Sequence, residues 1–343
     1  PATLRRVTWT LLLAGAFIGG LSMYQQVTRT YDNNYWGFAQ PSEAVFNAGA
    51  KDAITGAVSQ WRLAGQIGEK NRYAQVMLML VPLGIFRVFG ERKLLLRVLA
   101  GMCTGLIAMG AALAFSRGAA VGFVLMLAIM VFMRYIKIWQ VLVIILGLSL
   151  VLAALPQYSQ RLTSLEGFGA LFSDGTEAVG STDGATLSRL TEMGAAALVF
   201  IDHPLIGVGP GTFPLYYQQY SELIGLRTLN EDRQAHDLYL SIAAETGFAG
   251  LACFLFTLFV VLRSLARARK RWLTAEPEIA NMATAYMLSI VTYLTTGIFL
   301  HFAFIRYFWL IIALAGAVVY IADQRAKQAA AEEQAAGAAL ARA

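Results

Sequence analysis

The stretch LLLRVLAGMCTGLIAMGAALAFSRGAAVGFVLMLAIMVFMR, residues 94–134, decides the fold class of this chain. It contains two apolar runs, 94–115 and 118–134, which are separated only by a tight turn that carries Arg117. A helix of about 20 apolar residues is long enough to cross the roughly 30 Å hydrocarbon core of a bilayer. Two such runs with so short a connection predict a pair of helices that crosses a membrane twice.

Similar runs recur along the chain and predict a polytopic membrane protein. The 343 residues are 57% hydrophobic and 14% charged, whereas a soluble domain is about half apolar and about a quarter charged. The predicted fold is therefore an all-α transmembrane bundle. We expect about eight spans, at 7–24, 73–89, 94–115, 118–134, 139–156, 246–264, 281–300 and 303–321.

The charges between the runs predict the topology. One set of connections includes both termini and the basic stretch 263–271, and it holds 16 Lys/Arg against 6 Asp/Glu. The other connections hold 11 against 15, which completes the 27 Lys/Arg and 21 Asp/Glu of the chain. Because cytoplasmic loops carry the excess of Lys and Arg, we expect both termini in the cytoplasm. The net charge of +6 then reflects topology, and no nucleic-acid partner is expected.

This topology divides the chain into four parts. The parts are 1–156 with five spans and an outer loop at 25–72, 157–245 as a large periplasmic loop, 246–321 with three spans, and 322–343 as a cytoplasmic tail. Within the periplasmic loop, the apolar residues of 186–201 recur at helical spacing, so this loop is expected to be partly helical.

The most informative polar residues stand in AHDLYLSIAAETGFAG, residues 235–250, at the outward mouth of a predicted span. Ionisable groups at a membrane are costly and usually functional. The free N–H groups and the dipole of a helix N-terminus disfavour imidazolium, so His236 is expected to stay neutral and to accept a proton. Asp237 follows it directly. Gly247 and Gly250 are expected to permit close helix packing.

Arginines on the outward side complete a candidate site for phosphate chemistry. Arg117 lies in the FSRGA turn and Arg189 on the predicted outer helix. Taken singly, Arg117 is explained equally well by an arginine that snorkels to headgroups, and Arg189 is explained better by a solvated arginine than by a ligand contact. Together, arginines that bind phosphate oxygens beside a neutral histidine suit displacement at a carbon whose leaving group is a phosphate. No cluster of metal ligands accompanies them in the sequence, so neither a metal nor a cofactor is expected.

Four ordered motifs resemble the O-antigen ligase and polymerase superfamily. They are RLAGQIGEKN (62–71), SRGA (116–119), HPLIGVGPGTF (203–213) and HDLYLSIAAETGFAG (236–250). The resemblance implies an inverting, metal-independent glycosyltransferase of the GT-C class, with a glycan linked to undecaprenyl diphosphate as donor. It further implies that Arg117 and Arg189 hold the donor diphosphate and that His236 activates the acceptor hydroxyl. We expect Arg62, Asn71, Arg72, Asp237 and Arg306 to bind substrate.

The resemblance leaves the acceptor open. Lipid A–core, a growing O-antigen or exopolysaccharide, and a protein would all be glycosylated by the same chemistry at the periplasmic face of the bacterial inner membrane. The sequence departs from the family at Asp237, where an amide or serine is common. Eight spans are also fewer than the family usually has, so further chain is expected before Pro1.

Two readings without catalysis remain open. A transporter would place ionisable residues near the bilayer midplane and show inverted repeats. In this sequence the ionisable residues lie at the outer rim, and no repeat is evident. A structural scaffold of polysaccharide assembly would tolerate the loss of His236.

Overall fold

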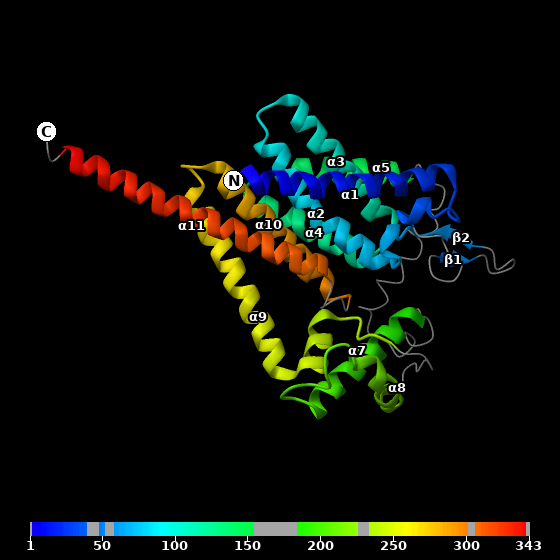
Figure 1. The fold of residues 1–343 in the computed structure, drawn as a ribbon. Helices are drawn as coiled ribbons and strands as arrows, with labels where there is room; N and C mark the ends of the chain where they lie inside the picture. The colour runs from blue at the N-terminus through cyan, green and yellow to red at the C-terminus, as the bar shows by residue number, and fades with distance from the viewer. Residues whose placement is uncertain are drawn as a thin grey trace.

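The computed structural model describes residues 2–39, 48–51, 58–153, 184–225, 233–300 and 306–340. Within these ranges the chain is helical apart from one antiparallel pair of short strands (Figure 1). The predicted all-α class is therefore confirmed, and the chain is a polytopic helical membrane protein. His301 and the whole stretch 157–183 lie outside the described residues.

The helices follow the predicted apolar runs closely. The helices at these runs are α1 (Ala2–Thr28), α2 (Lys70–Gly90), α3 (Leu94–Leu113), α4 (Arg117–Phe132), α5 (Ile138–Ala153), α9 (Leu238–Trp272), α10 (Pro277–Gly297) and α11 (Arg306–Leu340). The outer segments contain η1 (Tyr35–Gly37), β1 (Ala48–Lys51), β2 (Val58–Trp61), η2 (Gly65–Ile67), α7 (Gly184–Asp202) and α8 (Phe213–Ile224). The predicted tail, 322–343, is part of α11 as far as Leu340.

The number of candidate membrane spans in the structure differs from the eight that the sequence predicts. Among the described residues, five helices are long and apolar enough to cross a membrane, namely α1, α2, α3, α9 and α11. α4 and α5 are apolar but shorter. α10 is long enough, but it carries the buried polar residues Thr284, Ser289, Thr292 and Thr296. It packs against α2, α4, α9 and α11, so these polar groups face protein instead of lipid.

Glycines let the first helices of the bundle approach one another closely. A Cβ built on Gly19 of α1 would lie 2.2 Å from the carbonyl oxygen of Leu106 in α3. A Cβ built on Gly84 of α2 would lie 2.1 Å from the Thr104 hydroxyl, also in α3. Small residues at such contacts are typical of helix packing in membranes, where van der Waals contact drives association.

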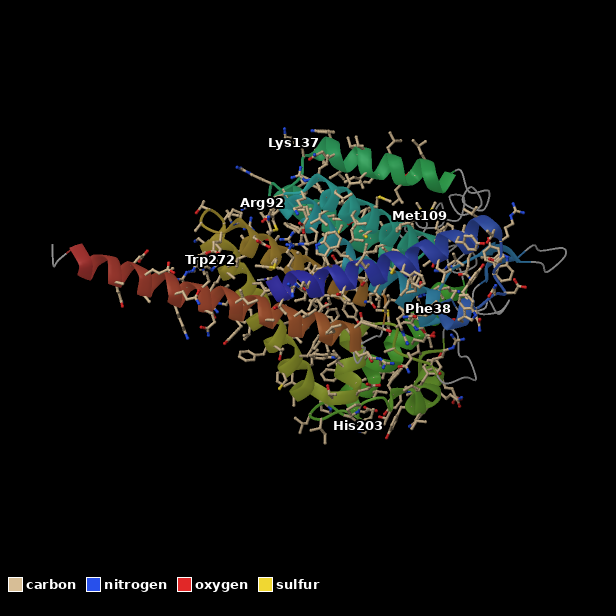
Figure 2. The ribbon with its side chains drawn as sticks, turned by 45° about the horizontal axis from the view of Figure 1, so that its top comes forward. Phe38, Arg92, Met109, Lys137, His203 and Trp272 are labelled. Carbon is tan, nitrogen blue, oxygen red and sulfur yellow. The ribbon has the colours of Figure 1, made fainter. Side chains whose placement is uncertain are left out.

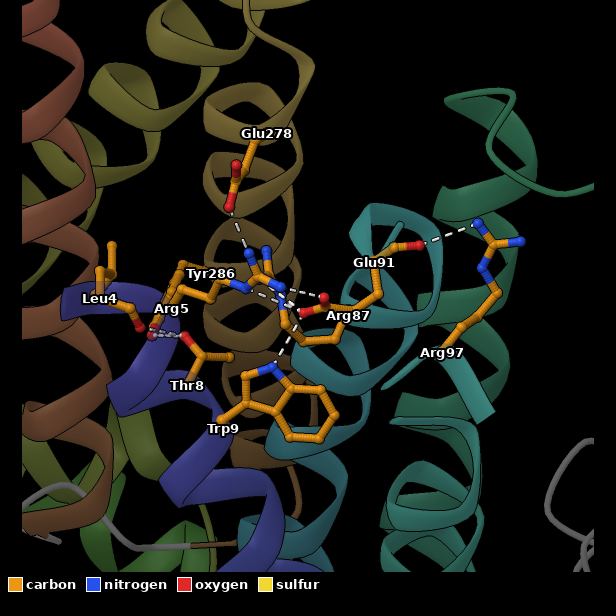
Figure 3. A network of polar contacts seen from close by, with 9 residues as sticks. All are labelled: Leu4, Arg5, Thr8, Trp9, Arg87, Glu91, Arg97, Glu278 and Tyr286. Carbon is orange, nitrogen blue, oxygen red and sulfur yellow. Dashed lines mark hydrogen bonds and ion pairs between the residues drawn. The ribbon is translucent and has the colours of Figure 1, made fainter. Parts of the chain in front are cut away.

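A buried carboxylate ties four helices together at one end of the bundle (Figure 3). Glu91 follows α2 and its side chain is fully buried. It accepts hydrogen bonds from Arg5 Nε at 3.2 Å and from Trp9 Nε1 at 3.0 Å, both in α1. Arg87 lies 3.5 Å from Glu91 and 4.0 Å from Glu278 of α10, and Arg97 of α3 donates to the Glu91 carbonyl. A buried charge is tolerated only when it is paired and hydrogen-bonded in this way.

The structure keeps the two predicted sets of connections apart. The set rich in Lys and Arg gathers at the end that holds Glu91, where Arg269 donates to the Tyr135 hydroxyl at 3.3 Å. Arg92, Lys137 and Trp272 lie toward this end, whereas Phe38 lies toward the other (Figure 2). The partition of the charges therefore agrees with the predicted alternation of the helices.

α9 is broken at Gly247, whose φ of 65° and ψ of −166° are not helical. Figure 1 shows the chain bending sharply at the lower end of this helix. The loop 203–209 inserts its backbone into the break and replaces the lost helical hydrogen bonds. The four bonds are Val208 N to Ala244 O at 3.0 Å, Gly209 N to Glu245 O at 2.8 Å, Phe248 N to Pro204 O at 2.7 Å and Ala249 N to Leu205 O at 3.2 Å.

Two glycines make this insertion possible. A Cβ on Gly207 would lie 2.4 Å from the carbonyl carbon of Glu245, and a Cβ on Gly247 would lie 2.4 Å from that of Leu205. Both distances are far below contact, so the two backbones meet only because neither residue has a side chain. This role of Gly247 differs from the helix packing expected from the sequence.

We expect Glu91→Gln to lower the free energy of unfolding by about 3–5 kcal/mol, because the buried Arg87 guanidinium then loses its charged partner. Unfolding in mixed micelles titrated with SDS measures this change. Glu278→Gln is the matched control, since its side chain is 47% exposed. That control should cost no more than about 1 kcal/mol. An equal loss in both variants would contradict the role given to Glu91.

We expect Gly247→Ala and Gly207→Ala to disrupt the junction between α9 and the loop. The backbone conformation alone costs roughly 1–3 kcal/mol for a residue with a side chain, and the Cβ clash adds to it. Gly105→Ala in α3 is the control, because a Cβ there meets nothing within 4 Å. Limited proteolysis of the outer segments should be accelerated only in the first two variants. Unchanged proteolysis of Gly247→Ala would disprove the constraint.

Candidate functional site

The outward end of α9 begins with Asp237, which caps the helix. Its Oδ1 accepts a hydrogen bond from Leu240 N at 2.7 Å, so the carboxylate satisfies one of the unpaired N–H groups of the first turn. The side chain is buried, and desolvation raises the pKa of this carboxyl above its usual value, opposed by the backbone N–H groups of Leu240 and Tyr239. The cap gives a structural reason for the acidic residue that follows His236.

His236 is held against a buried glutamate of α7. Its Nδ1 lies 2.6 Å from Oε2 of Glu192 and 3.3 Å from the carbonyl oxygen of Gln234. Both neighbours are acceptors, so Nδ1 must carry a hydrogen, and the neutral ring then has its lone pair on Nε2. The backbone of His236 is left-handed, with φ of 50°.

α7 also carries Arg189, one turn before Glu192. Residues three apart on a helix are neighbours on its surface, so Arg189 lies on the side of α7 that holds His236. Its side chain is exposed, whereas only 1% of Glu192 is exposed. The structure therefore brings one predicted arginine and the predicted histidine to the same helix face.

The outer segments pack around α7 and α8. Ala195 and Val199 of α7 are buried together with Phe213 and Tyr217 of α8. The carboxylate of Glu245 in α9 accepts backbone hydrogen bonds from Gly211 and Phe213, at the start of α8. Glu245 is thus a structural residue that joins α8 to α9 just above the break.

Arg117 is the first residue of α4 and is half-buried. Ser116 precedes it as the N-cap and accepts a hydrogen bond from Ala119 N at 3.4 Å. Phe115 turns the chain with φ of 48°. A helix N-terminus with an arginine in its first turn is a favourable place for a negatively charged phosphate.

Arg62 holds this turn in place. Its Nε donates to the carbonyl oxygen of Ala114 at 2.8 Å, and its Nη2 donates to the carbonyl of Phe115 at 3.0 Å and to Asn71 Oδ1 at 3.1 Å. Glu69 caps α2 by accepting from the backbone N–H groups of Asn71 and Arg72. The RLAGQIGEKN motif is therefore one connected structure, and it positions the loop that leads to Arg117.

The end of α10 lies between the Arg117 turn and the His236 turn. A Cβ built on Gly118 would lie 3.2 Å from Phe299, and one built on Gly297 would lie 2.8 Å from Leu238. The Tyr239 hydroxyl donates to the carbonyl of Leu294 at 3.1 Å. These contacts gather the first turns of α4 and α9 around one helix end.

The other predicted substrate-binding residues are placed differently. Arg72 lies in the first turn of α2 and is close enough to Tyr293 of α10 to interact with it electrostatically. Arg306 is exposed as the first residue of α11, and the contacts that join α4, α9 and α10 do not include it. In the described part of the chain, no group of three or more His, Cys, Asp or Glu is arranged to hold a metal ion.

Glu192 is the site residue that the sequence analysis missed. The signal was present, because Glu192 shares one helical stripe with Ala195, Ala196 and Val199, which are all buried. An acidic residue on the apolar face of a helix is almost never fully buried without a partner. Its partner, His236, lies 44 residues later in the sequence, and only the fold brings the two together.

We expect Asp237→Asn to keep the cap, whereas Asp237→Ala should cost about 1 kcal/mol of stability. Since burial raises the folded-state pKa of Asp237 above its usual 3.8, the stability it contributes is present below that value and lost as pH rises. The advantage of Asp237→Asn over the wild type should therefore grow between about pH 4 and pH 7. Unfolding in detergent at several pH values measures it, and a constant difference would contradict it.

Comparison with known proteins agrees with three of the four motifs, SRGA, HPLIGVGPGTF and HDLYLSIAAETGFAG, while RLAGQIGEKN lies before the matched segment. Residues 102–255 match the family model described as O-Antigen ligase. The matched segment begins within α3 and ends in α9 after the break, so it contains Arg117, Arg189, Glu192 and His236. No curated protein matches the chain. The helical membrane bundle and this match together show that the chain carries, at residues 102–255, the domain of the O-antigen ligase-like superfamily.

Proposed function

We propose that the protein transfers a glycan from undecaprenyl diphosphate to an acceptor hydroxyl at the periplasmic face of the inner membrane. The observation that carries the proposal is the contact of 2.6 Å between His236 Nδ1 and the buried Glu192 carboxylate. A histidine oriented in this way suits a general base. Arg189 lies one turn before Glu192 on α7, and Arg117 begins α4, whose first turn approaches Phe299 beside the end of α10 that also contacts Leu238 of α9. The family match supports the same reaction type.

In the proposed reaction, His236 removes the proton of the acceptor hydroxyl through Nε2. The hydroxyl oxygen attacks the anomeric carbon of the donor sugar, and the bond from that carbon to the diphosphate oxygen breaks. A single displacement of this kind inverts the configuration at the carbon. The positive charges of Arg117 and Arg189, with the N-terminus of α4, stabilise the negative charge that develops on the departing diphosphate.

The proposed reaction needs no metal. Guanidinium groups supply the positive charge at the leaving group, a task that a divalent cation performs in other glycosyl transfers. The GT-C assignment belongs to the same proposal and rests on the resemblance of the motifs.

In this proposal, some of the remaining predicted residues contact a substrate directly and others act through a neighbouring part of the site. Arg62 and Asn71 support the Arg117 turn, so they would act on the donor through that turn. Arg72 lies at the head of α2 and would contact the donor directly. Arg306 would contribute at the rim of the site, beside the start of α11. Asp237 would act on the acceptor through the helix that it caps.

The orientation follows from the charges. The end of the bundle that holds Glu91 and the basic stretch 263–271 would face the cytoplasm, together with both termini. The site at the mouths of α4 and α9 would then open to the periplasm. Loops on a fixed scaffold determine specificity, so the outer segment 157–245 would select among lipid A–core, a growing polysaccharide and a protein.

We expect Arg117→Ala, Arg189→Ala and His236→Ala each to lower glycan transfer by roughly 10²-fold or more, because each removes charge or proton transfer needed only in the transition state. The assay uses membranes with a defined undecaprenyl-diphosphate glycan and a panel of three acceptor types: lipid A–core, an undecaprenyl-linked glycan chain and an acceptor protein. The acceptor that becomes glycosylated identifies the reaction.

His203→Ala is the matched control, since His203 packs against Tyr216 at the far side of the outer segments. It should transfer glycan at the wild-type rate and reach the same protein level. Full transfer by His236→Ala would exclude the proposed chemistry and favour the scaffold. Movement of the lipid-linked glycan across vesicles without any covalent product would favour the transporter.

A further inference from the structure

We infer that Glu192 is the positioning residue of the proposed base, an inference that rests on the proposed function and deepens it. Glu192 would fix the tautomer and the ring orientation of His236, and it would stabilise the imidazolium that forms when the acceptor proton is taken. It would act through His236 without touching either substrate.

The burial of Glu192 is the first observation. Only 1% of the residue is exposed, although it lies on a helix whose opposite side is solvated. Taking a carboxylate out of water is costly unless charged and hydrogen-bonded partners compensate it. Its two charged partners in the described residues are His236 at 2.6 Å and Arg233 Nη1 at 3.8 Å. The buried carboxylate is therefore tolerated because these partners compensate its charge, and the nearer of the two is His236.

The backbone of His236 is the second observation. Its φ of 50° lies in the left-handed region, which costs a residue with a side chain on the order of 1 kcal/mol or more. The next residue, Asp237, is already extended and caps α9. The left-handed turn thus lets one chain segment start the helix and direct the imidazole toward α7. Strain of this kind persists where the surroundings determine the conformation.

Four charged groups lie on the two segments that meet at the imidazole. From α7 these are Glu192 and, one turn earlier, the exposed Arg189; from the segment before α9 they are Arg233 and Asp237. Asp237 is engaged by the N–H groups of its own helix. Glu192 is therefore the carboxylate that contacts the imidazole, through Oε2. Its other oxygen, Oε1, lies 3.8 Å from Arg233 Nη1.

This arrangement is that of a catalytic histidine whose tautomer and orientation are set by an adjacent carboxylate. A hydrogen on Nδ1, the ring nitrogen that lies 2.6 Å from the Glu192 carboxylate, leaves the lone pair of Nε2 for the acceptor hydroxyl. After proton transfer both ring nitrogens carry hydrogen, and the adjacent carboxylate stabilises the positive ring. Free histidine populates both tautomers, so part of the protein would be inactive without the glutamate.

The test compares Glu192→Gln with Glu222→Gln, which removes an exposed carboxylate from the neighbouring α8. With the glycan donor and the acceptor that the wild type glycosylates, Glu192→Gln should lower kcat by roughly 10²- to 10⁴-fold with little change in the KM for donor. The acidic limb of the pH dependence of kcat should also shift in Glu192→Gln. Glu192→Asp should recover part of the rate, and Glu222→Gln should behave as the wild type.

A second measurement does not depend on turnover or on the stability of a variant. The chain has three histidines, so ¹⁵N-histidine labelling in nanodiscs gives few signals, and His236→Ala assigns the one of interest. In the neutral imidazole of wild-type His236, Nδ1 should carry the hydrogen and Nε2 should not. The opposite tautomer in the wild type would overturn the inference, whether or not Glu192→Gln accumulates.

The outcomes separate the two proposals. Loss of transfer in His236→Ala with full transfer in Glu192→Gln would remove the role of Glu192 and leave the proposed function standing. Full transfer in His236→Ala would remove the proposed function itself. A rise in KM for donor with unchanged kcat in Glu192→Gln would also overturn the inference, because it would indicate a donor contact.

Discussion

The arrangement of the site depends on one exchange of backbone hydrogen bonds, between the loop 203–209 and the two parts of α9. A transmembrane helix that stops leaves unpaired N–H and C=O groups, and in a membrane these are too costly to leave unsatisfied. Here the loop supplies donors to one part of the helix and acceptors to the other. α9 can therefore bend without losing its hydrogen bonds, and its first turn contacts the end of α10 through Leu238 and Tyr239.

The same exchange connects two sequence motifs that stand apart in the chain. HPLIGVGPGTF provides the inserted backbone, and AETGFAG provides the break that receives it. Each needs a glycine where the other approaches, so Gly207 and Gly247 form one structural unit. Glu245 extends this unit by binding the start of α8. The apolar cluster of α7 and α8 thus packs against the start of α9. In the same region Glu192 contacts His236, which precedes α9.

The sequence predicted the parts of this protein that depend on local composition. Apolar runs locate helices because bilayer thickness fixes their length, and the positions of His236, Arg117 and Arg189 at helix ends follow from the same pattern. It did not predict the break, because the glycines of α9 fit a packing contact equally well. It did not predict Glu192 as a partner of His236 either, since a carboxylate on an apolar stripe shows that a partner exists without identifying it. The polar α10 was counted as an ordinary span for a similar reason: its neighbours, and not its own composition, shield it from lipid.

The end of α10 has a consequence for how the sequence of the candidate site can vary. Residues 297–299 separate the turn that carries Arg117 from the turn that carries His236, yet they lie outside the matched segment 102–255. The spacing between the first turns of α4 and α9 therefore depends on a helix end that the matched segment does not include. Bulk gained at Phe299 would have to be offset at Gly118, and bulk gained at Gly297 at Leu238. Substitutions at these four positions should thus be coupled, because the packing of three helices depends on the sum of their side-chain volumes.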